Sequence, residues 1–427
     1  MIADKDVHVK PRIIIHGGAG NILRENLPPK SEEAYRQALL DIVNEANALL
    51  HEHGATALDV ATHAVVQLEN NVMFNAGRGA VFTRAGTNEL EASVMVSRGS
   101  RKRGVGVVRL TKVKNPIKLA REMLLRGESS DGGGAQMHCQ IAGEQIEHLA
   151  EQWGLDMVKP SYFWTRKRWE EHRRGLGKQY DDTAFQVALK DAELEAEDLP
   201  VYTGYEDEKN DVEILVDEVS WNGRDYLPKG TVGAVVMDST GTICAATSTG
   251  GLTNKLPGRI GDTPTLGSGY WCEEWAAPQR GSRLANVLSS AANSILSCFN
   301  MVSGSTRPAE TGSTKTRAVG MSGTGNGDSF LRTNAVRTAA AIARFSSNAA
   351  SEVSLAHAVT AVAGPNGLLQ QSAGENWRKT GEGEGGIIGI EFNGEIGCGN
   401  VVFDYNCGGM FRAWIDGRGN AVAKVFR

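Results

Sequence analysis

The 427-residue chain lacks a strong charge of either sign and any long uninterrupted apolar run. Its 45 basic and 50 acidic side chains leave a net charge of -5, so no general basic surface indicates a nucleic-acid partner. No window of 18 apolar residues predicts a membrane-spanning helix, and the opening MIADKDVHVK lacks the apolar core of a signal peptide. We therefore expect a cytoplasmic protein with neither nucleic-acid nor membrane partners.

Cysteine and phosphate-binding motifs are also scarce. The six cysteines form no CxxC pair and no metal-ligand spacing with histidine, which indicates reduced, packed thiols. The glycine-rich run HGGAG (16–20) follows an apolar strand, as in some nucleotide-binding domains. It does not continue as GxGxxG, and the chain contains no GxxxxGK[ST] motif, so the pattern disfavours nucleotide binding.

The most informative feature present is the Gly230-Thr231 pair. Residues 231–237 (TVGAVVM) are β-branched and apolar, 238–241 (DSTG) have turn chemistry, and 242–247 (TICAAT) indicate a return strand. Thr231 is therefore predicted to begin a buried hairpin strand.

Cleavage before Thr231 would give one residue two catalytic groups, a hydroxyl nucleophile and a free α-amine base. An α-amine titrates at roughly 7.7 to 8.0, close to working pH, whereas the uncut chain has no such base. Gly230 lacks a Cβ and can adopt the unusual dihedral angles that strain the bond ahead of Thr231. The alternative is an ordinary Gly-Thr step from a loop into a strand.

Several ordered segments resemble the plant-type asparaginase and isoaspartyl aminopeptidase family of N-terminal nucleophile hydrolases. They are IIIHGGAG (13–20), FNAGRGAVFT (74–83), TSTGGLTNKLPGRIGD (247–262), GTGNGDSFLR (323–332), and the C-terminal EGGIIGIEFNGEIG and FDYNCGGMFRAW. The resemblance implies an α/β fold, the four-layer αββα sandwich. Residues 1–427 then form one domain, cleaved into an α chain (1–230) and a β chain (231–427), with a homodimer of processed units.

Carried over onto this sequence, the resemblance makes Thr231 the nucleophile and Thr249 a second threonine that hydrogen-bonds and positions it. Arg259 offers a planar fork for an α-carboxylate, and Asp262 accepts from an α-ammonium group. Arg259 or Asp262 alone, in a Gly/Pro-rich loop, would be read as a solvated charge or a turn former.

The same resemblance implies an oxyanion hole from the Thr324 hydroxyl and the Gly325 N–H, with the Gly327 carbonyl accepting from the substrate ammonium. Asn75 supports the nucleophile region. The loop before Asn75 resembles one that holds a structural sodium ion by its backbone carbonyls, and no cofactor is implied for catalysis.

The implied reaction is hydrolysis of the asparagine side-chain amide, of an N-terminal β-aspartyl peptide, or of both, through a β-aspartyl ester on Thr231. Substrates are thus small molecules or short peptides. Within the family, a glycosylasparaginase and a threonine endopeptidase are the alternatives, and Asp262 disfavours the endopeptidase because it binds a free ammonium. A non-catalytic binding scaffold of the same fold is the alternative from another class.

Apolar periodicity predicts the remaining organisation. Residues 181–218 contain 14 acidic side chains against two Lys and no Arg, so we expect a mobile linker there. The mixed-charge run 166–174 is read as an exposed helix face, 303–316 as a surface loop, and Trp271 and Trp275 as packing residues. Helices are expected at 31–54, 56–70, 115–126, 144–154, 283–300 and 328–346, and paired strands at 386–404.

Two segments depart from the family pattern. Residues 89–104 replace a more usual acidic, cysteine-containing run, and 269–278 differ from the small, Asn-rich residues often found there. Both changes can reshape the leaving-group side of the site.

Overall fold

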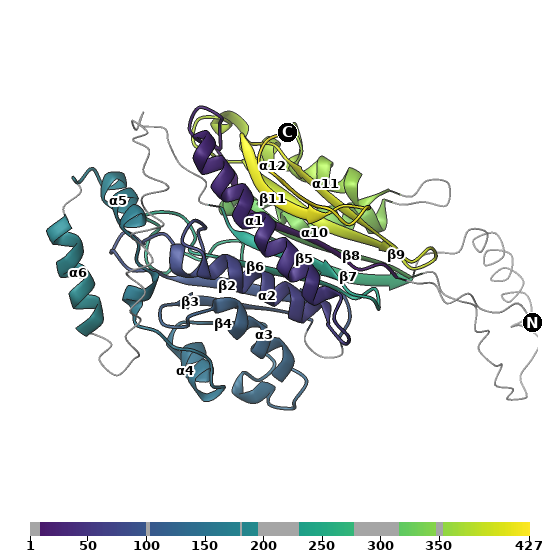
Figure 1. Ribbon diagram of the computed structural model, residues 1–427, viewed down its shortest axis with the longest axis horizontal. Coiled ribbons are helices and arrows are strands. Elements are labelled where there is room, and N and C mark those ends of the chain that lie inside the picture. Colours follow the sequence, from purple (N-terminus) through teal and green to yellow (C-terminus); the bar gives the residue numbers. More distant parts are fainter. Residues whose placement is uncertain (1–8, 100–102, 180–181, 195–229, 277–315, 347–352) are drawn as a thin grey trace, which may run out of the picture.

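The computed structural model describes residues 9–99, 103–179, 182–194, 230–276, 316–346 and 353–427. It is a mixed α/β structure with two β-sheets (Figure 1). The eight-stranded sheet has the order β12-β11-β1-β5-β6-β2-β3-β4, and the four-stranded sheet has the order β10-β9-β8-β7. The strands of the first sheet are β1 (Arg12–Gly20), β2 (Leu90–Val96), β3 (Gly104–Leu110), β4 (Gln140–Ala142), β5 (Val232–Met237), β6 (Ile243–Thr249), β11 (Gly409–Ile415) and β12 (Ala421–Lys424). Those of the second are β7 (Tyr270–Ala276), β8 (Thr316–Gly325), β9 (Gly385–Asn393) and β10 (Cys398–Tyr405).

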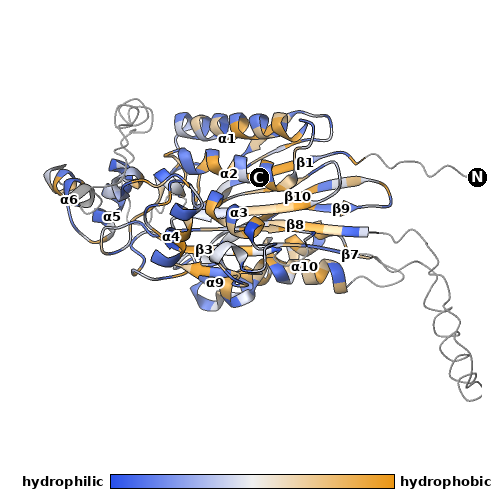
Figure 2. Ribbon diagram, turned by 90° about the horizontal axis from the view of Figure 1, so that it is seen from below, coloured by the Kyte–Doolittle hydropathy of each residue, from blue (hydrophilic) through white to orange (hydrophobic). Residues whose placement is uncertain are grey.

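The two sheets pack against each other through their inner faces. Side chains alternate along β5, so Val232, Ala234 and Val236 point to the helix side and Val235 and Met237 to the other sheet. Both faces are covered, which explains why this segment reads as a nearly continuous apolar run. Figure 2 shows the largely apolar strands lying between α1 at one edge of the body and α9 and α10 at the other.

Helices cover the outer face of each sheet. Helices α1 (Pro29–Leu50), α2 (Ala57–Asn70) and α3 (Pro116–Arg126) contact the eight-stranded sheet, and α10 (Ala335–Phe345) and α11 (Leu355–Ala363) contact the four-stranded sheet. The other helices are α4 (Glu144–Gln152), α5 (Arg166–Gly175), α6 (Asp182–Leu194), α9 (Gly327–Thr333) and α12 (Leu368–Ser372), with short 3-10 turns at Gly77–Gly79, Gly132–Gly134, Pro160–Phe163 and Gly374–Asn376. None of the described helices combines the length and apolar character needed to cross a bilayer.

Most predicted elements are confirmed, including the hairpin β5–β6, the pair β9–β10 and helices α1 to α4. The helix expected over 328–346 is instead two helices, α9 and α10. They are separated at Asn334, whose φ of 45° is left-handed, a conformation that Asn tolerates better than most residues. The helix expected at 283–300 and residues 303–315 of the expected loop lie outside the described residues, and Thr316 begins β8.

Over the first part of the segment expected to be a mobile acidic linker, residues 182–194 form the helix α6. Phe185 and Leu189, four residues apart on one helix face, are buried. The Phe185 ring centroid lies 6.1 Å from that of Trp164 and 5.9 Å from that of Trp169. Residues 195–218 of the expected linker lie outside the described part of the chain.

The prediction that 166–174 is an exposed helix face is wrong, because one side of α5 is buried. Arg168, Trp169 and His172 are nearly inaccessible. The Arg168 guanidinium donates to the Gly79 carbonyl at 2.8 Å and pairs with Glu171 at 2.9 Å. These partners satisfy a charge that would otherwise be costly to bury.

The expected packing role of Trp271 and Trp275 is confirmed. Both side chains lie on β7 beside α10. The Arg337 guanidinium carbon is 4.8 Å from the Trp271 ring centroid, and that of Arg344 is 5.5 Å from the Trp275 ring centroid. Cation–π contacts therefore tie α10 to the edge strand β7.

Phe185→Ala is expected to weaken the docking of α6 by about 3 to 5 kcal/mol, the usual cost of truncating a buried phenylalanine. Hydrogen exchange of the α6 amides measures this effect. Val187→Ala is the matched control, because Val187 is on the same helix and is 56% exposed. Equal exchange rates in the two variants would contradict the docking of α6 through Phe185.

Candidate active site

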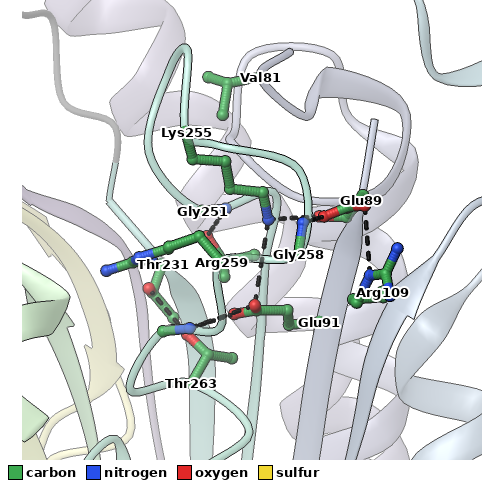
Figure 3. Close-up of polar contacts among 12 residues, drawn as sticks. Val81, Glu89, Glu91, Arg109, Thr231, Gly251, Lys255, Gly258, Arg259 and Thr263 are labelled. Carbon is green, nitrogen blue, oxygen red and sulfur yellow. Dashed lines mark hydrogen bonds and ion pairs between the residues drawn. The ribbon is translucent and has the colours of Figure 1, made fainter. Parts of the chain in front are cut away.

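Thr231 immediately precedes β5 and is nearly buried. Its Oγ1 lies 3.1 Å from the Oγ1 of Thr263, and Figure 3 shows the two hydroxyl groups facing each other. Sequence reasoning missed Thr263, although a hydroxyl residue directly after Asp262 was a visible signal. The contact connects the predicted nucleophile to the loop that carries Arg259 and Asp262.

Gly230 lies against the glycine turn at the end of β1. A Cβ added to Gly230 would be 2.2 Å from the Gly18 Cα, so no other residue fits without moving the backbone. Gly18 itself has a φ of +124°, which disfavours residues with a side chain. The glycines of the HGGAG run therefore allow the backbone at Gly18 to lie directly against Gly230, next to the Gly230-Thr231 bond.

Thr249 ends β6 next to Thr231. The β5–β6 register pairs Val232 with Ser248, so Thr231 and Thr249 are the next opposite positions. The predicted hydrogen bond between them is not formed. The Thr249 hydroxyl accepts from the Gly251 N–H at 3.0 Å, while the Thr231 hydroxyl contacts Thr263. In the folded chain Thr249 therefore lies opposite Thr231, but its hydroxyl is bonded to the segment that follows it.

Asn75 links two loops around the site. Its amide nitrogen donates to the Gly251 carbonyl at 2.8 Å, and its amide oxygen accepts from the Val81 N–H at 3.0 Å. Its backbone carbonyl accepts from the Gly250 N–H at 3.0 Å. The side chain is buried, so these bonds hold the segment that follows Thr249.

Thr324 and Gly325 end β8, on the other sheet. The Thr324 hydroxyl is fully buried and accepts from the Ala19 N–H at 3.2 Å, which places it beside the turn that contacts Gly230. Gly325 has a φ of +144°, and an added Cβ would be 2.4 Å from the Glu384 carbonyl oxygen. Both predicted oxyanion residues therefore lie near the predicted nucleophile. Thr324 and Gly325 belong to the four-stranded sheet, whereas Thr231 adjoins the eight-stranded sheet.

Arg259, Asp262 and Gly327 converge at one point. A Cβ on Gly327 would be 2.6 Å from Asp262 Oδ1 and 2.9 Å from Arg259 Nη2. Arg259 Nη2 also donates to Asp328 Oδ1 at 3.0 Å. Within the described residues, Arg259 Nε and Asp262 Oδ2 are buried without a hydrogen-bond partner. Such unsatisfied groups are costly, and a ligand with complementary charges would satisfy them.

Comparison with known proteins identifies the family. The family described as asparaginase matches residues 9–278. This chain belongs to that asparaginase family. It is 32% identical to the isoaspartyl peptidase of Salmonella typhimurium, covering 95% of each chain, and 32% identical to the isoaspartyl peptidase of Escherichia coli, covering 95% of this chain and 92% of the relative. It is 34% identical to the plant-type L-asparaginase of Pyrococcus furiosus over 62% of this chain and 71% of the relative.

In this asparaginase-family chain, three further charged residues contact the Arg259–Asp262 segment or its start: Glu89, Glu91 and Lys255. The sequence alone did not predict this cluster. Lys255 Nζ donates to the Glu89 carbonyl at 2.7 Å and lies 4.0 Å from Glu91 Oε1 (Figure 3). Glu89 immediately precedes β2 and Glu91 is its second residue, in a segment whose departure from the family pattern was visible in the sequence. The contacts of Glu89 and Glu91 with Lys255 join residues more than 160 positions apart in the chain, so the sequence alone could not predict them.

A buried histidine lies next to the nucleophile. His16 Nε2 is 2.7 Å from the Ser322 hydroxyl, which in turn lies 2.9 Å from the Thr247 hydroxyl. Burial lowers the pKa of His16 to about 3, and a hydrogen bond with the Thr231 backbone only partly opposes this. His16 is therefore neutral near pH 7 and forms part of a polar chain between the sheets.

Burial raises the pKa of Asp262 from its ordinary value of 3.8 to about 7, although the Arg259 charge opposes the shift. Between about pH 4 and pH 7 the folded protein therefore binds this proton more tightly than the unfolded chain does. The stability contributed by Asp262 is present at low pH and is lost as pH rises through this window. Asp262 is thus a destabilising group at neutral pH.

Asp262→Asn is expected to become more stable relative to the wild type as pH rises from about 4 to about 8. The gain is at most about 4 kcal/mol, because one pKa unit corresponds to about 1.4 kcal/mol. Denaturant unfolding across this range measures the difference between the two proteins, so shifts common to both cancel. Asp41→Asn, on the exposed face of α1, is the control. A pH-independent difference for Asp262→Asn would contradict the raised pKa.

Proposed function

We propose that this chain is a self-cleaving threonine amidohydrolase that converts L-asparagine to aspartate and ammonia, cleaves N-terminal β-aspartyl peptides, or does both. The observation that carries the proposal is the contact between Thr231 and Thr263. It joins a hydroxyl at the start of β5 to the loop whose Arg259 and Asp262 have unsatisfied polar atoms. The names of the relatives, isoaspartyl peptidase and L-asparaginase, support the same substrate class.

Self-cleavage divides residues 1–230 from 231–427. The Thr231 hydroxyl attacks the Gly230 carbonyl carbon, the acyl group moves from nitrogen to oxygen, and water hydrolyses the ester. The products are the Gly230 carboxylate and the free Thr231 amine. The close approach of Gly230 to Gly18 supports this step, because it constrains the backbone at the bond that breaks.

In the mature site, the Thr231 amine accepts the proton of its own hydroxyl, which attacks the side-chain carbonyl of the substrate. The negative charge on that oxygen is stabilised by the Thr324 hydroxyl and the Gly325 N–H. The leaving amine takes a proton, a β-aspartyl ester remains on Thr231, and water hydrolyses it to aspartate. Arg259 binds the α-carboxylate, while Asp262 and the Gly327 carbonyl bind the α-ammonium. Thr249, Thr263 and Asn75 position the nucleophile region.

Four finer features belong to the same proposal. The two packed sheets with helices outside support a four-layer αββα sandwich, and the proposal includes a homodimer of processed units in the cytoplasm. A sodium ion suits the loop before Asn75, because the Val72 and Phe74 carbonyl oxygens lie 2.6 and 2.1 Å from the position of a Cβ on Gly79. Carbonyl oxygens suit a hard cation, whose role would be structural. None of the chemical steps requires a cofactor.

Asp262 also bears on the alternatives within the family. A free α-ammonium exists in asparagine, in β-aspartyl dipeptides and in glycosylated asparagine, but not within a protein chain. The endopeptidase alternative is therefore disfavoured, and a glycosylasparaginase remains the second candidate. Rates measured on those three substrates test the proposal, and hydrolysis of none of them by the cleaved protein would favour a binding scaffold.

Thr231→Ala is expected to remain one chain and to release no detectable ammonia or peptide amine, because it lacks the attacking hydroxyl. Denaturing gel electrophoresis and the substrate assays measure both properties. Thr240→Ala, in the exposed turn of the same hairpin, should be cleaved and active. A cleaved and active Thr231→Ala protein would overturn the assignment.

Arg259→Lys is expected to raise KM by about tenfold or more, since a point charge cannot replace two charge-assisted hydrogen bonds worth about 1.5 to 3 kcal/mol each. Steady-state kinetics on asparagine and a β-aspartyl dipeptide measure the change. Arg36→Lys, in a surface pair with Glu33 on α1, is the control. Unchanged KM in Arg259→Lys would remove Arg259 from substrate binding.

A further inference from the structure

The loop that carries Arg259 and Asp262 is tied to the start of β2. The Glu89 carboxylate accepts from the Gly258 N–H at 2.7 Å, and the Glu91 carboxylate accepts from the Gly261 N–H at 3.2 Å. Lys255, where the loop begins, donates to the Glu89 carbonyl. These bonds attach the loop on both sides of Arg259, as Figure 3 shows for Glu89, Gly258 and Lys255.

Glu91 and Lys255 are charged side chains with almost no solvent exposure, 0% and 1% respectively. Their charged atoms lie 4.0 Å apart, and each has a second partner in the backbone: the Gly261 N–H for Glu91 and the Glu89 carbonyl, just before β2, for Lys255. Burial of both charges is costly, so removing one would leave the other uncompensated. A simple surface attachment of the loop would not require such a pair.

Glu91 acts at the residue between the two substrate-binding groups. An added Cβ on Gly261 would be 3.3 Å from Glu91 Oε2 and 2.7 Å from Arg259 Nη1, so the carboxylate and the guanidinium both border Gly261. Asp262 is the next residue along the chain. Moving the Gly261 backbone would therefore displace Asp262 directly. It would also change the distance between the Arg259 guanidinium and the Asp262 carboxylate.

We propose that Glu91, together with Lys255, is a positioning residue that holds the Gly261 backbone so that Arg259 and Asp262 converge on one amino acid substrate. The inference rests on the proposed function of this site and deepens it. Glu91 does not touch the reacting atoms. It acts by accepting a hydrogen bond from the Gly261 N–H and by the electrostatic interaction of its carboxylate with Arg259 and Asp262.

The charge of Glu91 gives this role a distinct signature. Burial is the main cause of the raised pKa of Asp262; among the charged groups, Arg259 opposes the shift, and Glu91 and Asp328 add to it. Burial also raises the pKa of Glu91, and the charges of Lys255 and Arg259 oppose that shift and favour the carboxylate form. Replacing Glu91 by a neutral residue therefore lowers the pKa of Asp262. Since Asp262 must be ionised to accept from the substrate ammonium, the acidic limb of kcat/KM moves to lower pH.

Glu91→Gln is the test, because glutamine keeps an oxygen acceptor for Gly261 and removes the charge. We expect KM for asparagine or a β-aspartyl dipeptide to rise by about tenfold, kcat per cleaved chain to change by less than about threefold, and the acidic limb to shift to lower pH. A KM within about twofold of wild type together with an unmoved acidic limb would overturn the inference.

Glu147→Gln is the matched control. The nearly buried Glu147 carboxylate also accepts from two backbone N–H groups, those of Thr111 and Lys112, but it belongs to α4 and bonds the segment after β3 instead of the loop that carries Arg259 and Asp262. A purely structural effect of losing a buried carboxylate would appear in both variants as lower stability, without a shift of the acidic limb. If Glu91→Gln does not fold, the double variant Glu91→Gln/Lys255→Gln removes both buried charges and should show the same KM and pH changes.

Binding of L-aspartate, the product common to both substrates, separates this inference from the proposed function. Calorimetry should show about tenfold weaker aspartate binding to Glu91→Gln than to the wild type, whether or not turnover occurs. A wild-type protein that hydrolyses neither substrate would refute the proposed function alone. Equal aspartate affinity in the two proteins would refute the positioning role alone.

Discussion

The site depends on the burial of β5 on both of its faces. β5 lies between β1 and β6 in the middle of the eight-stranded sheet, with helices on one side and the second sheet on the other. Its register is strongly constrained, since a one-residue slip would exchange the two apolar faces. Thr231 is the residue before this strand, so its position is determined by the packing of the whole core.

The buried charged groups near Thr231 lower the stability of the folded chain, and they are suited to binding a charged substrate. Asp262 and Arg259 retain buried polar atoms that nothing in the described residues satisfies, and Glu91 and Lys255 are buried directly behind them. A chain selected for stability alone would replace such groups with apolar side chains. Their clustering, three in one loop and Glu91 in the adjacent strand β2, is more easily explained by recognition of a substrate that carries one positive and one negative group.

The sequence predicted features that depend on local periodicity and turn chemistry, and missed those that depend on distant contacts. The hairpin β5–β6 followed from β-branched runs around DSTG, and the first four helices followed from their apolar spacing. The excess of acidic side chains in 181–218 hid α6, which is held by two side chains that pack beside Trp164 and Trp169. The buried side of α5 was missed for a similar reason, since Arg168 is satisfied by a carbonyl 89 residues away. The resemblance placed Thr231, Arg259 and Asp262 together, but the Thr263 contact and the Glu91–Lys255 pair required the folded chain.

The central claim is that Thr231 becomes a chain end, and the mass of the denatured wild-type protein after purification and incubation tests it most directly. The account predicts two fragments, one ending at Gly230 and the other beginning with an unmodified Thr231. A single species of full-length mass that persists on long incubation would contradict it, as would fragments divided at any other bond.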